Sequence, residues 1–151
     1  MKKISIPNYK DMEIKTIIFD FNGTIATDGI VNKDLKRKIL DLSNDYNVVI
    51  ITADTNNTVK KQFENTNIIV EIIKHTNDKL EVSKKYVPFV VFGNGNNDIE
   101  IFNNSQLSIG VIGEEGCSAK LLLNCDIVVN NINNGIDLLL NNNRLKATLR
   151  K

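Results

Sequence analysis

The chain has 151 residues, 42% of them hydrophobic and 25% charged, a balance typical of one globular domain spanning residues 1–151. Its formal net charge of +1 gives no electrostatic reason to expect a nucleic acid or a membrane surface as partner. The longest apolar runs are about half the length that spans a bilayer, and no signal peptide is visible. Cys117 and Cys125 lack further ligands at zinc spacing, so we expect reduced thiols and a cytoplasmic protein.

Short apolar runs alternate with amphipathic segments along the whole chain. Residues 3–7 and 12–16 flank a turn-forming tetrapeptide and predict an N-terminal β-hairpin. Buried strands are expected at 17–21, 48–51, 68–73, 89–92, 107–112 and 127–129. Helices are expected at about 32–42, 56–64, 77–85, 96–102, 118–123 and 132–140.

The strands are runs of mainly β-branched residues in which apolar and polar side chains do not alternate, and a helix follows each of them. This pattern indicates an α/β fold, a three-layer α/β/α sandwich with a mainly parallel sheet covered on both faces. Asn32 can cap the first helix, and Thr76 or Asn77 the third. The basic tail at 144–151 also carries Leu145 and Leu149, which favours a docked terminal segment or a subunit contact over a nucleic-acid patch.

Two strand-to-glycine junctions stand out as candidate chemistry. Asp20 ends the first buried strand and is followed by an Asn-Gly turn and Thr24, whose hydroxyl can bond a phosphate oxygen or cap the next segment of the chain. A second junction lies at 93–98, after the strand at 89–92. Because active sites of open parallel sheets lie at the carboxyl ends of the strands, the two junctions predict an anion site beside carboxylates, and hence phosphoryl chemistry.

These segments resemble motifs of the haloacid dehalogenase (HAD) superfamily. Residues 20–24, Asp-Phe-Asn-Gly-Thr, resemble its first motif, Asp-x-Asp-Gly-Thr, and are closer to the P-type ATPase branch, where the second acidic residue is absent. Residues 52–54, Thr-Ala-Asp, are similar to the Thr-Gly-Asp motif of that branch, and residues 93–98 resemble its Gly-Asp-Gly-x-Asn-Asp motif. The whole chain resembles the small soluble P-type ATPase-like phosphatases, which implies a Rossmann-like, HAD-like catalytic domain.

The resemblance implies that Asp20 is a nucleophile that forms an aspartyl phosphate, with the Thr52 hydroxyl on a phosphoryl oxygen. A lysine must neutralise the phosphoryl charge, and Lys79 is the candidate, with Lys84 as the alternative. Asp54 could orient a loop or cap the helix that begins near Asn56. Phosphate contacts are expected from Asn22, Gly23, Thr24, Ala53, Gly95 and Asn97. A Mg²⁺ ion is expected on Asp20, the Asn22 carbonyl, Asn94 and Asp98. Asp98 would either bind the ion directly or support the groups that bind it.

Two positions depart from the superfamily pattern. Asn22 replaces an Asp that protonates the leaving group in most phosphatases of the superfamily. An acid–base contribution of roughly 10²–10⁴-fold to the reaction rate should therefore be missing. Asn94 replaces an acidic metal ligand, so the affinity for Mg²⁺ should be lower. We therefore expect a slow phosphohydrolase, a phosphatase or an ATPase-like enzyme, with a persistent phosphoenzyme. The alternative is a catalytically weak or inactive HAD-fold binding or assembly module.

The spacing of the motifs leaves no room for a cap domain. About seven residues separate Thr24 from Asn32, and residues 55–79 hold only a helix and a strand. A capless site is open to water unless another subunit covers it, so a homo-oligomer is a hypothesis. The expected substrate is a phosphorylated small molecule, and the only histidine, His75, is expected at the surface and not in catalysis.

Overall fold

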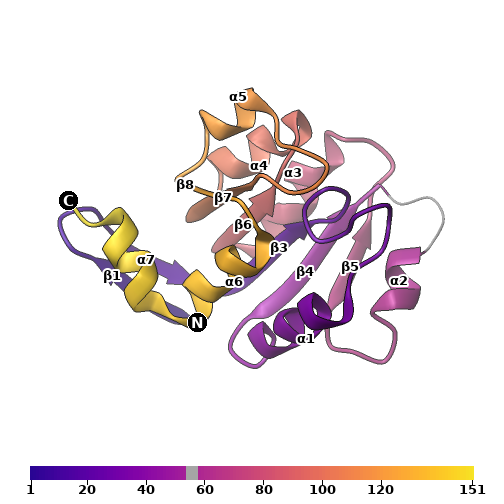
Figure 1. Ribbon diagram of the computed structural model, residues 1–151, viewed down its shortest axis with the longest axis horizontal. Coiled ribbons are helices and arrows are strands. Elements are labelled where there is room, and N and C mark those ends of the chain that lie inside the picture. The colour runs from indigo at the N-terminus through magenta and orange to yellow at the C-terminus, as the bar shows by residue number, and fades with distance from the viewer. Residues whose placement is uncertain (54–57) are drawn as a thin grey trace.

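The computed structural model describes residues 1–53 and 58–151 (Figure 1). The strands are β1 (Lys2–Ile6), β2 (Lys10–Ile14), β3 (Thr16–Asp20), β4 (Asn47–Thr52), β5 (Ile69–Ile72), β6 (Phe89–Gly93), β7 (Leu107–Val111) and β8 (Ile127–Val129). The α-helices are α1 (Lys33–Leu42), α2 (Thr58–Gln62), α3 (Asp78–Ser83), α4 (Ile99–Asn103), α5 (Ala119–Leu122), α6 (Ile132–Leu140) and α7 (Asn142–Leu149). Two short 3₁₀ turns, η1 (Lys84–Tyr86) and η2 (Asn96–Asp98), precede β6 and α4.

Six strands form one parallel sheet in the order β5-β4-β3-β6-β7-β8. The chain builds outward from β3 to β5, then returns to the other side of β3 with β6 and builds outward to β8. The strand order therefore reverses between β3 and β6, and such a switch point leaves a crevice at the carboxyl ends of the two strands. The strand expectations are confirmed, with ends that differ by one or two residues.

Alternate residues of each central strand enter opposite cores, which is why the strand sequences show no polar face. In β3, Ile17 and Phe19 pack in one cluster with α1, α2 and α6, whereas Ile18 packs in the other with α3, α4 and α5. Helices thus cover both faces of the sheet (Figure 1). The predicted three-layer α/β/α sandwich is confirmed.

The helix ends follow local signals in some places and not in others. The Asn32 side chain accepts the backbone N–H of Leu35 at 2.8 Å, so the predicted cap of α1 is present. Asn77 stands at the start of α3 without a side-chain cap bond, and the Asp78 carboxylate instead accepts the His75 N–H. The start of the helix expected from about residue 56 lies outside the described residues, where α2 is seen from Thr58 on.

The N-terminal hairpin and the C-terminal tail form one unit beside the sheet. Strands β1 and β2 pair antiparallel and bury every second residue, among them Ile4 and Met12. The tail is a helix, α7, which lies along the hairpin and buries Leu145 (Figure 1). The Lys151 N–H donates to the Pro7 carbonyl at 3.3 Å. The tail is therefore docked on the hairpin, which is one of the two roles expected for it, a docked segment or a subunit contact.

The described residues between β3 and α1 contain no inserted domain. They form a compact loop in which Thr27 and Ile30 exchange backbone hydrogen bonds. Among the described residues, those from Thr58 to Lys79 likewise hold only α2, β5 and the start of α3, so the fold without a cap is as predicted for the part of the chain that the structure describes. In the part of the chain that the structure describes, no helix is long and apolar enough to cross a bilayer.

We expect Leu145→Ala to lower the free energy of unfolding by about 2–5 kcal/mol, because it opens a cavity between α7 and the hairpin. Thr148→Ala changes an exposed residue of the same helix and should stay within about 0.5 kcal/mol of the wild type. Urea unfolding measures both values. Equal stabilities of the two variants would contradict the packing of α7 described above.

Candidate active site

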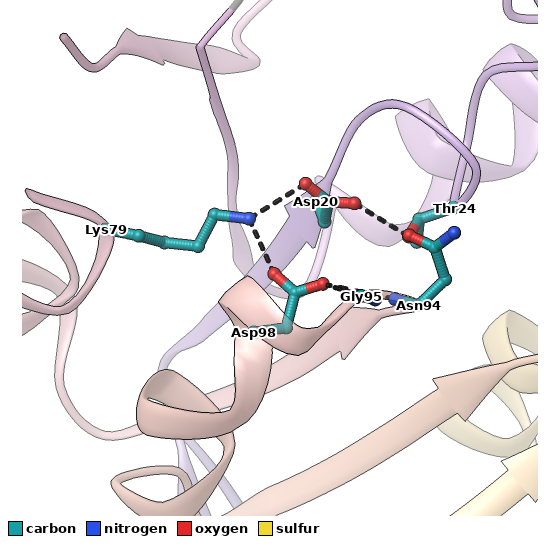
Figure 2. A network of polar contacts seen from close by, with 6 residues as sticks. All are labelled: Asp20, Thr24, Lys79, Asn94, Gly95 and Asp98. Carbon is teal, nitrogen blue, oxygen red and sulfur yellow. Dashed lines mark hydrogen bonds and ion pairs between the residues drawn. The ribbon is translucent and has the colours of Figure 1, made fainter. Parts of the chain in front are cut away.

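The polar residues singled out by the sequence converge at the switch point between β3 and β6. Asp20 ends β3 on the same face as Ile18, toward the layer that contains α3. Lys79 lies in the first turn of α3, and Asp98 ends the turn after β6. Figure 2 shows the three side chains pointing toward one another from these elements.

Lys79 lies between two carboxylates. Its Nζ is 2.8 Å from Asp20 Oδ1 and 2.5 Å from Asp98 Oδ1. The side chains of Lys79, Asp20 and Asp98 are 4%, 12% and 0% exposed. The other oxygen of Asp98, Oδ2, accepts the backbone N–H groups of Asn94 and Gly95 at 3.1 Å each. Asp98 is therefore fully engaged in holding the lysine and the loop after β6.

A second set of contacts surrounds the other oxygen of Asp20. Thr24 Oγ1 lies 3.1 Å from Asp20 Oδ2 and 3.3 Å from Asn94 Oδ1 (Figure 2). The amide nitrogen of Asn94 donates to the Gly116 carbonyl at 3.1 Å, which turns the amide oxygen toward Thr24 and Asp20. One carboxylate oxygen and one amide oxygen thus converge on a single hydroxyl.

Glycine is required at two positions of this arrangement. Gly23 has a φ of +77°, and a Cβ there would collide with the side-chain amide of Asn94. A Cβ on Gly93 would collide with the Asp98 carboxylate. The glycines of the two sequence motifs therefore allow the loops after β3 and β6 to approach each other closely.

Burial and charge shift the acid–base behaviour of the cluster. Burial, followed by the charge of Asp98, raises the pKa of Asp20 to about 6, although Lys79 and Thr24 act in the opposite direction. Burial alone would lower the pKa of Lys79, but the two carboxylates outweigh it and raise that pKa. With a pKa of about 6, Asp20 is mostly ionised at neutral pH, where it lies against the Lys79 ammonium.

The oxygen atoms beside Thr24 suit a hard divalent cation. Asp20 Oδ2 and Asn94 Oδ1 are the kinds of donors that Mg²⁺ prefers, and Mg²⁺ in proteins keeps several water ligands. Asp98 uses both oxygens elsewhere, which favours a supporting role for it over direct ligation. No group of three His, Cys, Asp or Glu side chains suitable for a metal occurs among the described residues. The donor set fits a weakly held Mg²⁺ better than a transition metal.

The other sequence candidates lie around this centre. Thr52 is buried at the end of β4, one residue beyond the Ile51 that pairs with Asp20, and Ala53 comes after it at the surface. Asn22 is exposed on the loop after β3. Asn97 is exposed beside Gly95, near enough that a Cβ on that glycine would meet its side-chain oxygen.

Two alternatives from the sequence can be placed, and one cannot. Lys84 is exposed and pairs with Glu81 at 2.6 Å, so Lys79 and not Lys84 lies at Asp20. His75 is exposed, as expected. Asp54 lies outside the described residues.

The sequence reasoning missed the loop after β7 as part of the site. Gly116 accepts the Asn94 amide, and the Ser118 N–H donates to the Asn94 carbonyl at 2.8 Å. A Cβ added at Gly113 would lie 3.3 Å from the Gly23 carbonyl oxygen, so the loop after β7 also comes close to the loop after β3. The only signal available was the pair of glycines in this loop, at 113 and 116, which indicates a turn but not its partner.

Comparison with known proteins identifies a relative of the chain. The uncharacterized protein MJ0073 of Methanocaldococcus jannaschii is 53% identical over 74 residues, which cover 47% of this chain and 80% of the relative. This chain belongs to the MJ0073 family. No model of a known protein family matches it.

Solved structures show which fold this MJ0073 family member has. A cobalt-bound deoxy-D-mannose-octulosonate 8-phosphate phosphatase from Haemophilus influenzae superposes with a TM-score of 0.66 at 15% identity, covering 91% of this chain and 90% of its own. The 3-deoxy-D-manno-octulosonate 8-phosphate phosphatase of Moraxella catarrhalis, in complex with magnesium, phosphate and KDO, superposes with a TM-score of 0.62 at 18% identity. The match covers 91% of this chain and 94% of the phosphatase. A protein of Legionella pneumophila described as a HAD superfamily (subfamily III A) hydrolase superposes with a TM-score of 0.64 at 17% identity. The match covers 90% of this chain and 87% of that protein. The fold is therefore that of the HAD superfamily.

We expect Asp20→Asn to raise the stability of the protein in EDTA at about pH 7.5. With a pKa of about 6 in the folded state, against about 3.9 for an unfolded Asp, the folded chain binds a proton more tightly between about pH 4 and pH 6. Wild-type stability therefore falls as the pH rises through that window. The variant lacks this loss and should gain roughly 1–3 kcal/mol above pH 7, a difference that shrinks toward pH 4. Urea unfolding at several pH values tests this.

Removing the lysine should have the opposite effect. Lys79→Met leaves two buried carboxylates without a cation and should cost about 3–5 kcal/mol of the free energy of unfolding at neutral pH. Lys84→Met removes an exposed lysine from the neighbouring turn and should change stability by less than about 1 kcal/mol. A Lys79→Met protein as stable as the Lys84→Met control would contradict the buried ion pairs.

Proposed function

We propose that this protein is a Mg²⁺-dependent phosphohydrolase of the soluble P-type ATPase-like branch of the HAD superfamily, with Asp20 as its nucleophile. The observation that carries the proposal is the position of Lys79 between Asp20 and Asp98, beside the oxygens of Thr24 and Asn94. A carboxylate, a fixed cation and hard oxygen donors at one end of a sheet are the groups that phosphoryl transfer needs. The assignment to the branch rests on the three sequence segments, since the comparisons concern the superfamily.

The proposed reaction has two steps on Asp20. In the first, a carboxylate oxygen attacks phosphorus while the bond from phosphorus to the leaving-group oxygen breaks, giving an aspartyl phosphate and an alcohol. In the second, water attacks phosphorus, the bond to Asp20 breaks, and inorganic phosphate leaves. Lys79 supplies a positive charge fixed next to the nucleophile throughout. The Thr52 hydroxyl supplies a donor for a phosphoryl oxygen, and the Thr24 hydroxyl does so when it turns from Asp20 to the bound phosphoryl group. Bound Mg²⁺, on Asp20, Asn94 and the Asn22 carbonyl, supplies further positive charge for those oxygens.

Asn22 makes this chemistry slow. An amide cannot give a proton to the leaving group or take one from water, so both protons must be exchanged with solvent. The aspartyl phosphate should accordingly persist longer than in phosphatases with an acid at this position. The substrate is a phosphorylated small molecule, handled by a single capless domain formed by residues 1–151.

The first test uses beryllium fluoride, which mimics an acyl phosphate where a carboxylate, a metal and a cation meet. We expect Mg²⁺ and beryllium fluoride together to raise the melting temperature of the wild type and of Asp45→Asn, a surface control. Asp20→Asn should show no such increase and no turnover of p-nitrophenyl phosphate. Equal melting shifts and equal turnover in the two variants would refute the proposal. Absence of both effects in the wild type would favour a binding module instead.

Asn22→Asp should speed turnover, because it restores a group that can donate and accept the missing proton. We expect kcat for p-nitrophenyl phosphate to rise by roughly 10²–10⁴-fold. Asn143→Asp adds the same charge at the exposed start of α7 and should leave kcat unchanged. A steady-state assay at saturating Mg²⁺ compares the three proteins, and an Asn22→Asp enzyme no faster than the wild type would contradict the role given to residue 22.

A further inference from the structure

A cavity of about 560 Å³ adjoins the loop that carries the nucleophile. It lies between this loop, the start of α1, the loop after β7 and the start of α6. Gly23 and Thr24 form part of its wall, and Thr24 also bonds Asp20. The volume is in the range of small-molecule sites in proteins. The position beside Thr24 makes the cavity a candidate for the part of a substrate that leaves as the alcohol.

The polar lining of the cavity consists mainly of side chains that are uncharged. Its polar residues without charge are Thr24, Thr27, Asn32, Asn130, Asn131 and Asn133. Glu114 is the one charged residue among the described residues that line it, and no lysine or arginine is among them. Lys61 lines a second hollow, which shares Ile30 with the cavity but is separate from it. The wall therefore offers hydroxyl and amide groups together with one negative charge.

Two helices begin at the cavity, and their first N–H groups could in principle attract an anion. At α1 the Asn32 side chain accepts the Leu35 N–H at 2.8 Å, and Asp34 adds a negative charge to the first turn. At α6 the Asn131 side chain accepts the Asn133 N–H at 2.9 Å. A capping side chain thus takes one of the first N–H groups at each helix start, and neither start carries the full charge of a lysine or arginine.

We propose that this cavity is the leaving-group subsite of the enzyme and that it selects uncharged, hydroxylated groups of polyol or sugar size over carboxylates. The inference rests on the proposed phosphohydrolase function. Asn side chains both donate and accept, which matches the alternating needs of sugar hydroxyls. A carboxylate in the same place would lose its water without gaining a cation and would lie near Glu114. Two of the solved structures with this fold are named for an octulosonate phosphate, a sugar acid, and the proposed selection would separate this chain from that substrate class.

Matched pairs of substrates test the selection. Glucitol 6-phosphate differs from 6-phosphogluconate, and glycerol 3-phosphate from 3-phosphoglycerate, in having a hydroxymethyl group where the acid has a carboxylate on the leaving group. At fixed ionic strength and saturating Mg²⁺ we expect kcat/KM to be at least about tenfold higher for the neutral member of each pair, the factor for one unfavourable interaction of about 1.4 kcal/mol. Equal values, or a preference for the acid, would overturn the inference.

A charge reversal at Glu114 gives a second measurement. In Glu114→Lys the preference for the neutral ester should fall by at least about tenfold, because a cation then faces the carboxylate. Glu115→Lys makes the same change at the next residue, which is exposed and does not line the cavity, and should keep the wild-type ratio. The same loss of preference in both variants, or in neither, would overturn the assignment of the cavity.

The two proposals fail in different ways. A wild type that turns over p-nitrophenyl phosphate through Asp20 but does not distinguish the paired esters retains the phosphohydrolase function and overturns the subsite. A wild type that turns over no phosphate ester and shows no stabilisation by beryllium fluoride overturns both.

Discussion

The ammonium group of Lys79 holds the site together, because it is the cation placed between two buried carboxylates. Without it, Asp20 at the end of β3 and Asp98 in the turn after the neighbouring β6 would repel each other. Much of the surrounding structure maintains this contact. The N–H groups after β6 fix Asp98, and Gly93 leaves room for its carboxylate. The same contact lowers the pKa of Asp20 against the larger effect of burial, which raises it to about 6.

Such a cluster lowers the stability of the fold that carries it. The side chains of Asp20, Lys79 and Asp98 are held buried, and the raised pKa of Asp20 reflects part of that loss of stability. The two apolar cores on either face of the sheet offset it, since the central strands are buried along nearly their whole length. This separation of the polar site from the apolar cores follows from the topology, which places the polar cluster at the switch point and the apolar side chains along the strands.

Asn22 and Asn94 stand where the superfamily pattern has acidic residues, so these positions keep a polar side chain but lose its negative charge. Asn94 aims an oxygen at the same hydroxyl as Asp20, through an amide group held by the loop after β7. Asn22 is an exposed amide two residues after Asp20, where the proposed mechanism would otherwise use an acid. In the adjoining cavity, asparagines again provide polar groups without charge, so the surroundings of the transferred phosphate would be far more charged than those of the leaving group.

The sequence alone determined what depends on near neighbours in the chain. Buried strands, the Asn32 cap and Asp20 at a strand end were all predictable, because periodicity, capping and turn chemistry act over a few residues. Only the tertiary structure decided that Lys79 and not Lys84 meets Asp20, since both are lysines near the same helix. It also decided that Gly116 orients Asn94, that the tail forms a docked helix, and that Glu114 lines the cavity beside Thr24. These features join residues far apart in sequence, whose meeting is set by how the layers pack and not by any local signal.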